Sequence, residues 1–306
     1  MTVADSARVI AGVELGGTKA LAVLASGSTI THRSRVPTTT PTATLRALGD
    51  QLTQWRANGH AFAAIGIGCF GPVGLDRARA DFGHITTTPK AGWADTDVRG
   101  HFARAFDVPV GLDTDVTGAA LAEGRWGAAR GCTEHIYITI GTGIGAGIIV
   151  GGRPVHGLVH PELGHLRVRR RPGDTFAGVC PYHGDCIEGL ASGPAIAARA
   201  GMPADQLGPE HPVWADVTDE LAELMTAMIL AVSPQRIVVG GGVGNNQRFL
   251  FDQVRTSTRG RLAGYVAALD DASAMEALIV PPGLGDDAGP LGAVALGVGA
   301  LGGPAD

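Results

Sequence analysis

The sequence predicts an α/β protein made of two halves that share one plan. Apolar strand-like runs alternate with segments of helical length, a pattern typical of α/β layers around mostly parallel sheets. The runs end in glycine-rich turns, where many of the 47 glycines gather instead of forming a low-complexity tract. One strand-turn-strand unit occurs twice, which indicates an internal repeat of the fold.

The first half opens with a predicted β-hairpin at residues 9–24, whose two apolar runs meet at a glycine turn. A second hairpin of the same shape is predicted at 136–150, and aligning Gly16 with Gly141 superposes their flanking strands. A later apolar strand with a glycine-rich end also occurs twice, at 64–72 and at 236–243. Segments of helical length lie at residues 42–58, 97–106, 116–126, 194–200 and 213–232.

This repeat predicts two domains. A strand ends at Asp113 to Asp115, so we place the boundary just after it. The smaller N-terminal domain is expected to span residues 1–116 together with a glycine-rich C-terminal helix at 289–306. The larger domain is expected to span 117–288. The full chain of 306 residues is long enough for two domains of ordinary size.

Composition excludes several classes of function. A net charge of −5 offers no basic surface for nucleic acid. The longest weakly polar stretch, residues 288–303, is interrupted by Pro290 and several glycines and is too short to span a membrane. The N-terminal residues have neither a basic region nor a long apolar region, so we expect no secretory signal and a cytoplasmic location.

The segment with the most ligand-type side chains lies between residues 158 and 192. Cys180, His183 and Cys186 have C-x2-H-x2-C spacing, which lets one tight loop direct all three at a single ion, and His165 offers a fourth ligand. Four nitrogen and sulfur donors are typical of a closed, structural zinc site. The alternatives are a disulfide between the two cysteines, or two unrelated buried thiols.

The two glycine turns offer exposed backbone N–H groups and a threonine hydroxyl, which suit phosphate oxygens. The first turn is not a P-loop, because Thr18 precedes Lys19 and a strand follows. The second fits the dinucleotide fingerprint G-x-G-x-x-A at 141–146, but that fingerprint must open a helix and a strand is expected here. Either turn alone could be an ordinary hairpin turn, and their repetition favours phosphate binding.

Seven motifs in order resemble the sugar kinases of the ROK family (repressors, open reading frames, kinases) within the actin-like ATPase superfamily. They are G-V-E-L-G-G-T-K (12–19), T-P-K-A-G-W (88–93), D-T-D (113–115), G-T-G (141–143), H-P-E-L-G-H (160–165), C-P-Y-H-G-D-C-I-E (180–188) and G-G-G-V (240–243). The cysteine loop, T-P-K-x-G-W and Glu14 resemble the bacterial fructokinase branch. The resemblance implies two ribonuclease H-like domains flanking an active-site cleft.

The resemblance also implies ATP-dependent phosphorylation of a hexose, with D-fructose giving fructose 6-phosphate. Asp115 matches the family's catalytic base, and its alternative role is the N-cap of the following helix. Glu162, His165 and Glu188 match residues that hold sugar hydroxyls, while Thr88 and Lys90 match a substrate-side loop. One nitrogen of His165 would bind zinc while the other reaches the sugar.

Further expected roles concern ATP and Mg²⁺. Glu14 would act through Mg²⁺-bound water, or else make a local hydrogen bond from a half-buried strand. The expected nucleotide-binding residues are Gly16, Gly17, Thr18, Lys19, Gly141, Thr142, Gly143, Gly240, Gly241 and Gly242. Arg167, Arg169, Arg170 and Arg171 form a basic run to which we assign no function.

Several alternatives remain for the function. Glucokinase, mannokinase and N-acetylmannosamine kinase belong to the same family, and Thr117 stands where the fructokinase branch commonly has asparagine, which bears on sugar preference. A sugar-responsive regulator is disfavoured because no helix-turn-helix segment precedes the first strand, and a nicotinamide enzyme is disfavoured by the hairpin at 141–146. The resemblance implies a homodimer whose only other partners are sugar and ATP.

Overall fold

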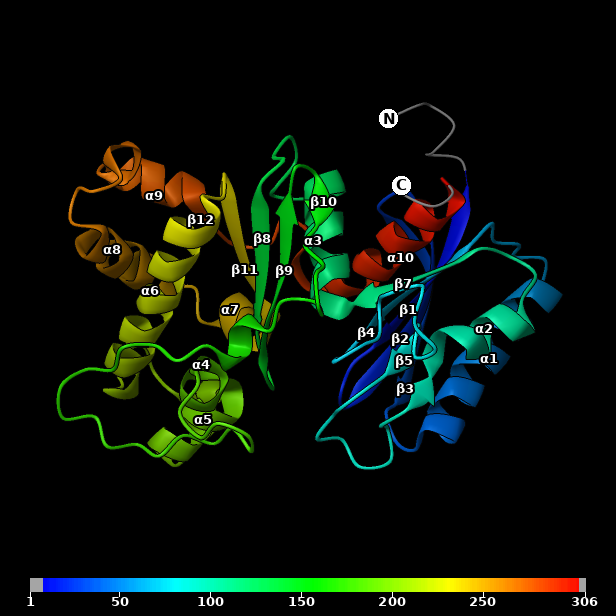
Figure 1. Cartoon of the computed structure of the whole chain (residues 1–306), viewed down its shortest axis with the longest axis horizontal. Helices are drawn as coiled ribbons and strands as arrows, with labels where there is room; N and C mark the ends of the chain where they lie inside the picture. The colour runs from blue at the N-terminus through cyan, green and yellow to red at the C-terminus, as the bar shows by residue number, and fades with distance from the viewer. Residues whose placement is uncertain (1–7, 303–306) are drawn as a thin grey trace. The chain divides into compact units, whose positions relative to one another are not determined.

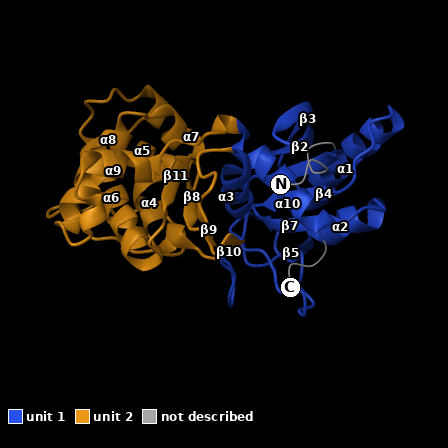
Figure 2. Ribbon diagram, turned by 90° about the horizontal axis from the view of Figure 1, so that it is seen from above, with its two compact units in different colours: residues 1–126, 154–160, 287–306 blue, residues 127–153, 161–286 orange. Residues whose placement is uncertain are grey.

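The computed structural model describes residues 8–302 (Figure 1). The chain forms two compact units (Figure 2). Unit 1 contains the chain up to Trp126, residues 154–160, and the chain from Asp287 onward. Unit 2 contains residues 127–153 and 161–286. Parts of the expected domains at residues 1–7 and 303–306 lie outside the described residues.

Unit 1 is organised by a five-stranded sheet within the described residues, in the order β3-β2-β1-β4-β7. The first three strands form an antiparallel meander, whereas β4 and β7 run parallel to β1. The strands are β1 (Val9–Leu15), β2 (Lys19–Ser26), β3 (Thr29–Pro37), β4 (Ile65–Cys69) and β7 (Val110–Thr114). A small ribbon pairs β5 (His84–Ile85) with β6 (Thr96–Asp97).

Helices cover both faces of this sheet (Figure 1). Side chains alternate along β1, so Val13 joins the core beneath α1 while Gly12 faces α10. Leu48 of α1 and Phe102 of α2 are fully buried in that core. The helices of unit 1 are α1 (Pro41–Ala57), α2 (Val98–Ala105), α3 (Asp115–Trp126) and α10 (Ala288–Leu301).

Glycines let α10 approach the sheet and α3 at backbone distance. A Cβ atom on Gly66 of β4 would lie 1.8 Å from the carbonyl oxygen of Ala293, far inside contact distance. A Cβ atom on Gly292 of α10 would lie 2.5 Å from the backbone nitrogen of Ala119 in α3. These contacts explain why α10 has glycine at the positions that face β4 and α3: a side chain there would hold its neighbours apart.

Unit 2 repeats the plan with a sheet in the order β10-β9-β8-β11-β12. Again a hairpin, β8 with β9, is extended by parallel strands, β11 beside β8 and β12 beside β11. The strands are β8 (His135–Ile140), β9 (Ile144–Val150), β10 (Arg153–Pro154), β11 (Arg236–Gly240) and β12 (Ile279–Val280). The two glycine turns therefore occupy equivalent places, between the first two strands of each sheet.

The helices of unit 2 enclose a second core that contains Trp214, Leu224 and Ile237. The α-helices are α4 (Ile187–Ala191), α5 (Gly193–Ala200), α6 (Val213–Val232), α7 (Gly241–Asn246), α8 (Leu250–Leu262) and α9 (Ala272–Leu278). Short 3₁₀ turns are η1 (Leu163–His165), η2 (Ala204–Gln206), η3 (Ala267–Leu269) and η4 (Gly285–Asp287), the last of which leads into α10.

The predicted α/β class and the repeated hairpin are confirmed by these two sheets. The turn at 141–146 continues into strand β9, so it does not open a helix as a dinucleotide fingerprint must. Unit 1 extends to Trp126 and not only to the expected boundary at residue 116, because α3 packs against α10. Across residues 8–302, no helix combines the length and the apolar character that a membrane crossing requires.

The substitution Gly66→Ala tests the close contact between β4 and α10. We expect it to lower the free energy of unfolding by about 3 kcal/mol or more, since the clash is with backbone atoms that cannot rotate away. Urea unfolding followed by circular dichroism measures the effect. The control is Gly49→Ala in α1 of the same unit, where the nearest atom would be 3.5 Å away. Equal stability of the two variants would contradict the proposed packing constraint.

Candidate functional site

The parallel strands of unit 1 end side by side at one edge of the sheet. Leu15 of β1 pairs with Cys69 of β4, and Cys69 pairs with Thr114 of β7. The residues that follow are therefore brought to the same edge, namely the Gly16 turn and Asp115 at the start of α3. Ligands of open α/β sheets bind at the carboxyl ends of the strands, so this edge is the candidate site of unit 1.

Asp115 is half-buried at this edge. Burial raises the pKa of its carboxyl to about 6, although a hydrogen bond from the Val116 backbone N–H opposes the shift. A Cβ atom on Gly68 of β4 would lie 3.3 Å from the Asp115 Cα, so glycine leaves room for this residue. A carboxyl with a pKa near neutral pH is suited to accept a proton from a hydroxyl group.

Thr114, and not Asp115, caps helix α3. Its hydroxyl oxygen accepts a hydrogen bond from the Thr117 backbone N–H at 3.1 Å, which is the N-cap interaction. The same hydroxyl donates to the Thr117 hydroxyl at 2.7 Å. Thr117 is buried and bonded within the cap, and the Asp115 side chain is left to another role.

Glu14 supplies a second carboxyl on the same face of the sheet. It pairs across the β1–β4 ladder with Gly68, next to which Asp115 lies. Burial raises the pKa of Glu14 to about 7, the charge of Asp115 adds to the shift, and the charge of Lys19 opposes it. A Cβ atom on Gly289 of α10 would lie 2.2 Å from the Glu14 Oε1, so this carboxyl packs directly on the helix backbone.

Hydrogen bonds fix the backbone of the first glycine turn at Gly16, while the next two residues of the turn are exposed. The Gly16 N–H donates to the carbonyl of Lys19 at 3.1 Å, and the Thr38 hydroxyl donates to the carbonyl of Gly16 at 2.8 Å. Gly17 and Thr18 are exposed, and a Cβ atom on Gly17 would meet no atom within 4 Å. The turn therefore has space beside its backbone, as an anion-binding turn requires.

The loop with Thr88 and Lys90 reaches this turn in the structure. The Lys90 ammonium donates to the carbonyl oxygen of Gly17 at 2.6 Å. The Lys90 backbone N–H donates to the Thr88 hydroxyl oxygen at 3.3 Å. Trp93 is fully buried, and its indole N–H donates to the carbonyl of Thr39 at 2.8 Å. Lys90, predicted as a substrate-side residue, thus lies at the turn predicted to bind phosphates.

The second glycine turn, in unit 2, has a comparable link to a predicted sugar-binding residue. The Glu188 Oε2 accepts a hydrogen bond from the Ile144 N–H at 3.0 Å, directly after the turn. A Cβ atom on Gly143 would lie 2.5 Å from that same oxygen, so the turn must be glycine here. The Gly193 N–H also donates to the carbonyl of Gly141 at 2.8 Å, while Thr142 is exposed.

The third glycine segment lies where β11 meets α7. A Cβ atom on Gly240 would lie 2.4 Å from the Tyr137 hydroxyl oxygen. Gly241 has a φ of 81°, a conformation that other residues rarely adopt. Gly242 has no atom within 4 Å of a Cβ position, so the start of α7 is open on that side.

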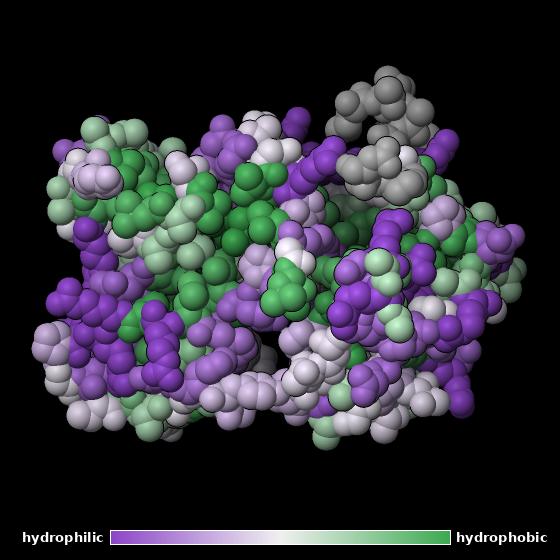
Figure 3. Space-filling view, in the orientation of Figure 1, coloured by the Kyte–Doolittle hydropathy of each residue, from purple (hydrophilic) through white to green (hydrophobic). Residues whose placement is uncertain are grey.

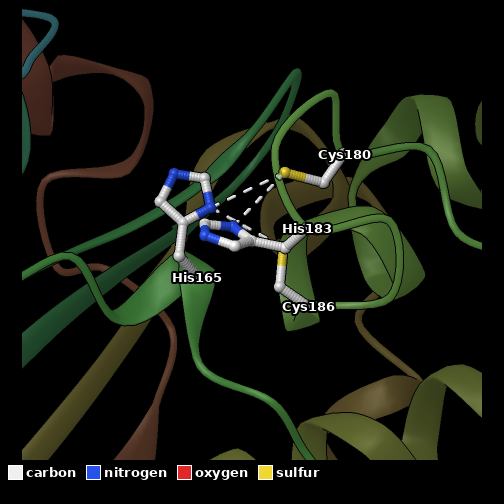
Figure 4. Close-up of side chains that lie close together, drawn as sticks. All are labelled: His165, Cys180, His183 and Cys186. Carbon is white, nitrogen blue, oxygen red and sulfur yellow. Dashed lines mark hydrogen bonds between the residues drawn. The ribbon is translucent and has the colours of Figure 1, made fainter. Parts of the chain in front are cut away.

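His165, Cys180, His183 and Cys186 come together in unit 2 (Figure 4), with one ligand atom from each within 4.8 Å of the others. The His165 Nδ1 lies 3.7 Å from the Cys180 Sγ and 3.6 Å from the Cys186 Sγ, and the His183 Nδ1 lies 3.8 Å from the Cys180 Sγ. Tetrahedral coordination of one ion places nitrogen and sulfur ligands about 3.5 Å apart. Both cysteines are free thiols, so these four side chains can hold a metal ion.

The backbone around this cluster is tightly packed. The Cys180 N–H donates to the carbonyl of Gly184 and the Gly184 N–H donates back, which closes the loop on itself. His165 is placed by turn η1, in which its N–H donates to the carbonyl of Glu162 at 3.0 Å. The second ring nitrogen of His165 points away from the cysteines (Figure 4). Glu162, which precedes this turn, is exposed.

Ion pairs hold the loop between His165 and Cys180, which carries the basic run. Arg170 pairs with Asp174 at 2.9 Å, and Asp174 also pairs with Arg199 of α5 at 3.2 Å. Arg199 contacts the buried Glu220 of α6, where burial raises the pKa of Glu220 to about 7. The outer arginines of the run, 167 and 171, pair with aspartates as well. Figure 3 shows a hydrophilic surface at lower left, over this loop.

Sequence reasoning passed over two histidines in residues 154–160. The His156 Nε2 lies 2.9 Å from the Asp113 Oδ2, and this contact raises the pKa of His156. The buried His160 accepts a hydrogen bond from the Val73 N–H at its Nε2. These contacts attach the segment to unit 1 just before Glu162. The histidine that begins the H-P-E-L-G-H motif is visible in the sequence, but the sequence does not indicate which residue it contacts.

Comparisons with known proteins agree with this arrangement. The family model described as "ROK family" matches residues 10–299. A fructokinase from Pediococcus pentosaceus is 40% identical over 294 residues, covering 96% of this chain and 99% of that protein. A fructokinase from Zymomonas mobilis subsp. mobilis is 43% identical over 296 residues, covering 94% and 96%.

Solved structures are similar over the same extent. A ROK hexokinase from Thermus thermophilus has a TM-score of 0.77 at 27% identity, covering 97% of this chain and 100% of that chain. A ROK family glucokinase from Streptomyces griseus, in complex with glucose and AMPPNP, has a TM-score of 0.70 at 26% identity, covering 94% and 99%. The similarity extends over both units.

The raised pKa of Asp115 predicts that this carboxylate lowers stability. A folded-state pKa of about 6 exceeds the value of about 3.9 in unfolded chains. The charged form is therefore disfavoured on folding, and stability falls as pH rises between these values. We expect Asp115→Asn to be more stable than the wild type by about 1 kcal/mol at pH 8, since partial exposure reduces the penalty.

Urea unfolding at pH 8 and pH 5 checks this prediction. The difference in the free energy of unfolding between the variant and the wild type should be smaller at pH 5. A variant less stable than the wild type at pH 8 would contradict the prediction. The control Asp95→Asn changes an exposed aspartate of the same unit. The difference in the free energy of unfolding between this variant and the wild type should be the same at both pH values.

Proposed function

Because the chain belongs to the ROK family, we propose that it transfers the terminal phosphoryl group of ATP to D-fructose and forms fructose 6-phosphate. Fructokinases more than a third identical along nearly the whole chain support a hexose kinase with this substrate. The observation that carries the proposal in the structure is Asp115, a half-buried carboxyl with a pKa of about 6 at the strand ends that also position a glycine turn.

In the proposed reaction, Asp115 accepts the proton of the sugar 6-hydroxyl as that oxygen forms a bond to the γ-phosphorus. The bond from the γ-phosphorus to the β-phosphate oxygen breaks, and ADP leaves. The glycine turns bind phosphate oxygens through backbone N–H groups. Bound Mg²⁺ supplies charge neutralisation, and the buried carboxyl of Glu14 is suited to accept hydrogen bonds from water on that ion.

Unit 2 is proposed to supply the sugar contacts. Glu162 would offer acceptor oxygens, and the outward-pointing nitrogen of His165 would offer a donor, for neighbouring hydroxyls. Glu188 has one oxygen engaged by Ile144, which leaves the other for sugar. Thr117 is bonded within the α3 cap, so sugar selection is assigned to residues other than Thr117. A cytoplasmic location and a homodimer stay predictions from the sequence.

We further propose that the four-residue cluster holds zinc as a structural ion. Two thiols and two imidazoles are the donor set that zinc prefers, and all four positions are filled by protein, which leaves none for chemistry. Binding through Nδ1 would fix the ring of His165, so that its other nitrogen keeps one orientation and one tautomer.

A panel of sugars tests the reaction. ADP release with MgATP should give a kcat/KM for fructose at least about tenfold above those for glucose, mannose and N-acetylmannosamine. Asp115→Asn serves as the control without a base and should lower kcat by about 10²–10⁴. A clear preference for another sugar would refute the fructose assignment, and near-normal turnover of the variant would refute the role of Asp115.

Elemental analysis tests the metal. We expect one zinc per chain in the wild type, and Cys180→Ser or Cys186→Ser should lower both the zinc content and the Tm. The matched control is Cys132→Ser, a partly exposed thiol outside the cluster, which should keep its zinc. A fully active, metal-free protein with a disulfide between Cys180 and Cys186 would overturn the zinc proposal.

A further inference from the structure

The chain uses lysine at two positions only. Of its 24 lysines and arginines, Lys19 and Lys90 are the lysines, and all the others are arginines. Both lie at the same glycine turn, although they are far apart in sequence. Lys19 follows the turn directly, and the Lys90 ammonium contacts the carbonyl of Gly17 within it. Of the two, Lys90 places its ammonium in contact with the turn itself, and an ammonium is a compact point charge, unlike a planar guanidinium.

Several of the arginines form ion pairs. Arg33, Arg104, Arg199 and Arg261 are each paired with a carboxylate. In the part of the chain that the structure describes, Lys90 makes no ion pair with a carboxylate, and its partner is a neutral carbonyl. One of its three N–H donors is used by Gly17. The positive charge and two donors are left for an anionic group.

The loop that carries Lys90 holds it in place. Next to Lys90, the backbone N–H of Trp93 donates to the carbonyl of Lys90 at 3.2 Å and closes a turn. The Trp93 side chain is fully buried. Its indole N–H donates to the carbonyl of Thr39, and its ring is in edge contact with Phe70. Because the loop is anchored through this indole, the ammonium is directed at the turn by the fold and its position costs little additional ordering.

From these contacts we propose that Lys90 binds the transferring phosphoryl group, and not the sugar hydroxyls. The inference rests on the proposed kinase function and assigns a cation to its phosphate. Lys90 stays protonated throughout: the proton lost by the sugar goes to Asp115, and the ammonium balances charge on the γ-phosphoryl oxygens as their bond to ADP breaks. An ammonium suits this role because it is a point charge that can serve Gly17 and a phosphoryl oxygen together.

Lys90→Met and Lys90→Gln test the proposal. Both remove the charge, but glutamine can still donate to the carbonyl of Gly17. We expect each variant to lower kcat by about 10²-fold and to weaken the binding of Mg²⁺–AMPPNP by about tenfold. Binding of AMP and of fructose should change by less than about twofold, since neither carries the γ-phosphoryl group. Isothermal titration calorimetry measures binding without turnover.

The matched control is Arg46→Met, which removes an exposed charge from α1 of the same unit and should leave every constant unchanged. Two results would overturn the proposal. Either Lys90→Gln behaves as the wild type, which would make the contact with Gly17 merely structural, or the variants lose affinity for fructose while AMPPNP binding and kcat are kept. Retained circular dichroism and Tm confirm that the variants fold.

Failure of the kinase assignment is distinguishable from failure of this inference. A wild-type protein that phosphorylates no sugar of the panel refutes the proposed function, while the AMPPNP titration still measures Lys90. An active wild type with normal Lys90 variants refutes the inference alone.

Discussion

The backbone contact between α10 and β4 is the constraint on which the site of unit 1 depends. Because Gly66 has no side chain, α10 lies against the sheet, and Gly292 likewise lets α3 approach α10 at backbone distance. The same helix packs on the Glu14 carboxyl at Gly289, while α3 begins with Asp115. Close packing thus places two carboxyls at one sheet edge and desolvates both, so their raised pKa values follow from the same glycines that stabilise the unit.

The two units use the repeated hairpin in the same way. In each unit, a charged side chain from a distant segment is bonded at the glycine turn: Lys90 of a loop to the carbonyl of Gly17, and Glu188 of α4 to the N–H of Ile144, directly after the turn. A turn alone is flexible, but a turn bonded to another segment moves with that segment. In unit 2, α4 directly follows Cys186 of the metal cluster, so a bound metal would restrain Glu188 and with it the glycine turn.

Sequence reasoning found the features that have strong local signals. Apolar runs ending in glycine predicted both hairpins, and the spacing of Cys180, His183 and Cys186 predicted the metal cluster. It passed over β3, because that edge strand alternates between partly and fully exposed residues and has no apolar run. It grouped Lys90 with the sugar contacts, because a motif gives neighbours along the chain, whereas the contact with Gly17 arises only when the loop folds back.

The place of α10 in the chain also has a consequence for biosynthesis. Unit 1 requires α10 to cover one face of its sheet, and α10 is synthesised after every other helix and strand that the structure describes in residues 8–302. The residues of unit 2, from Gly127 to Asp286, have all been synthesised before that point. The later-made unit can thus complete its core first, while the strands synthesised earliest wait for a helix made more than 200 residues afterwards.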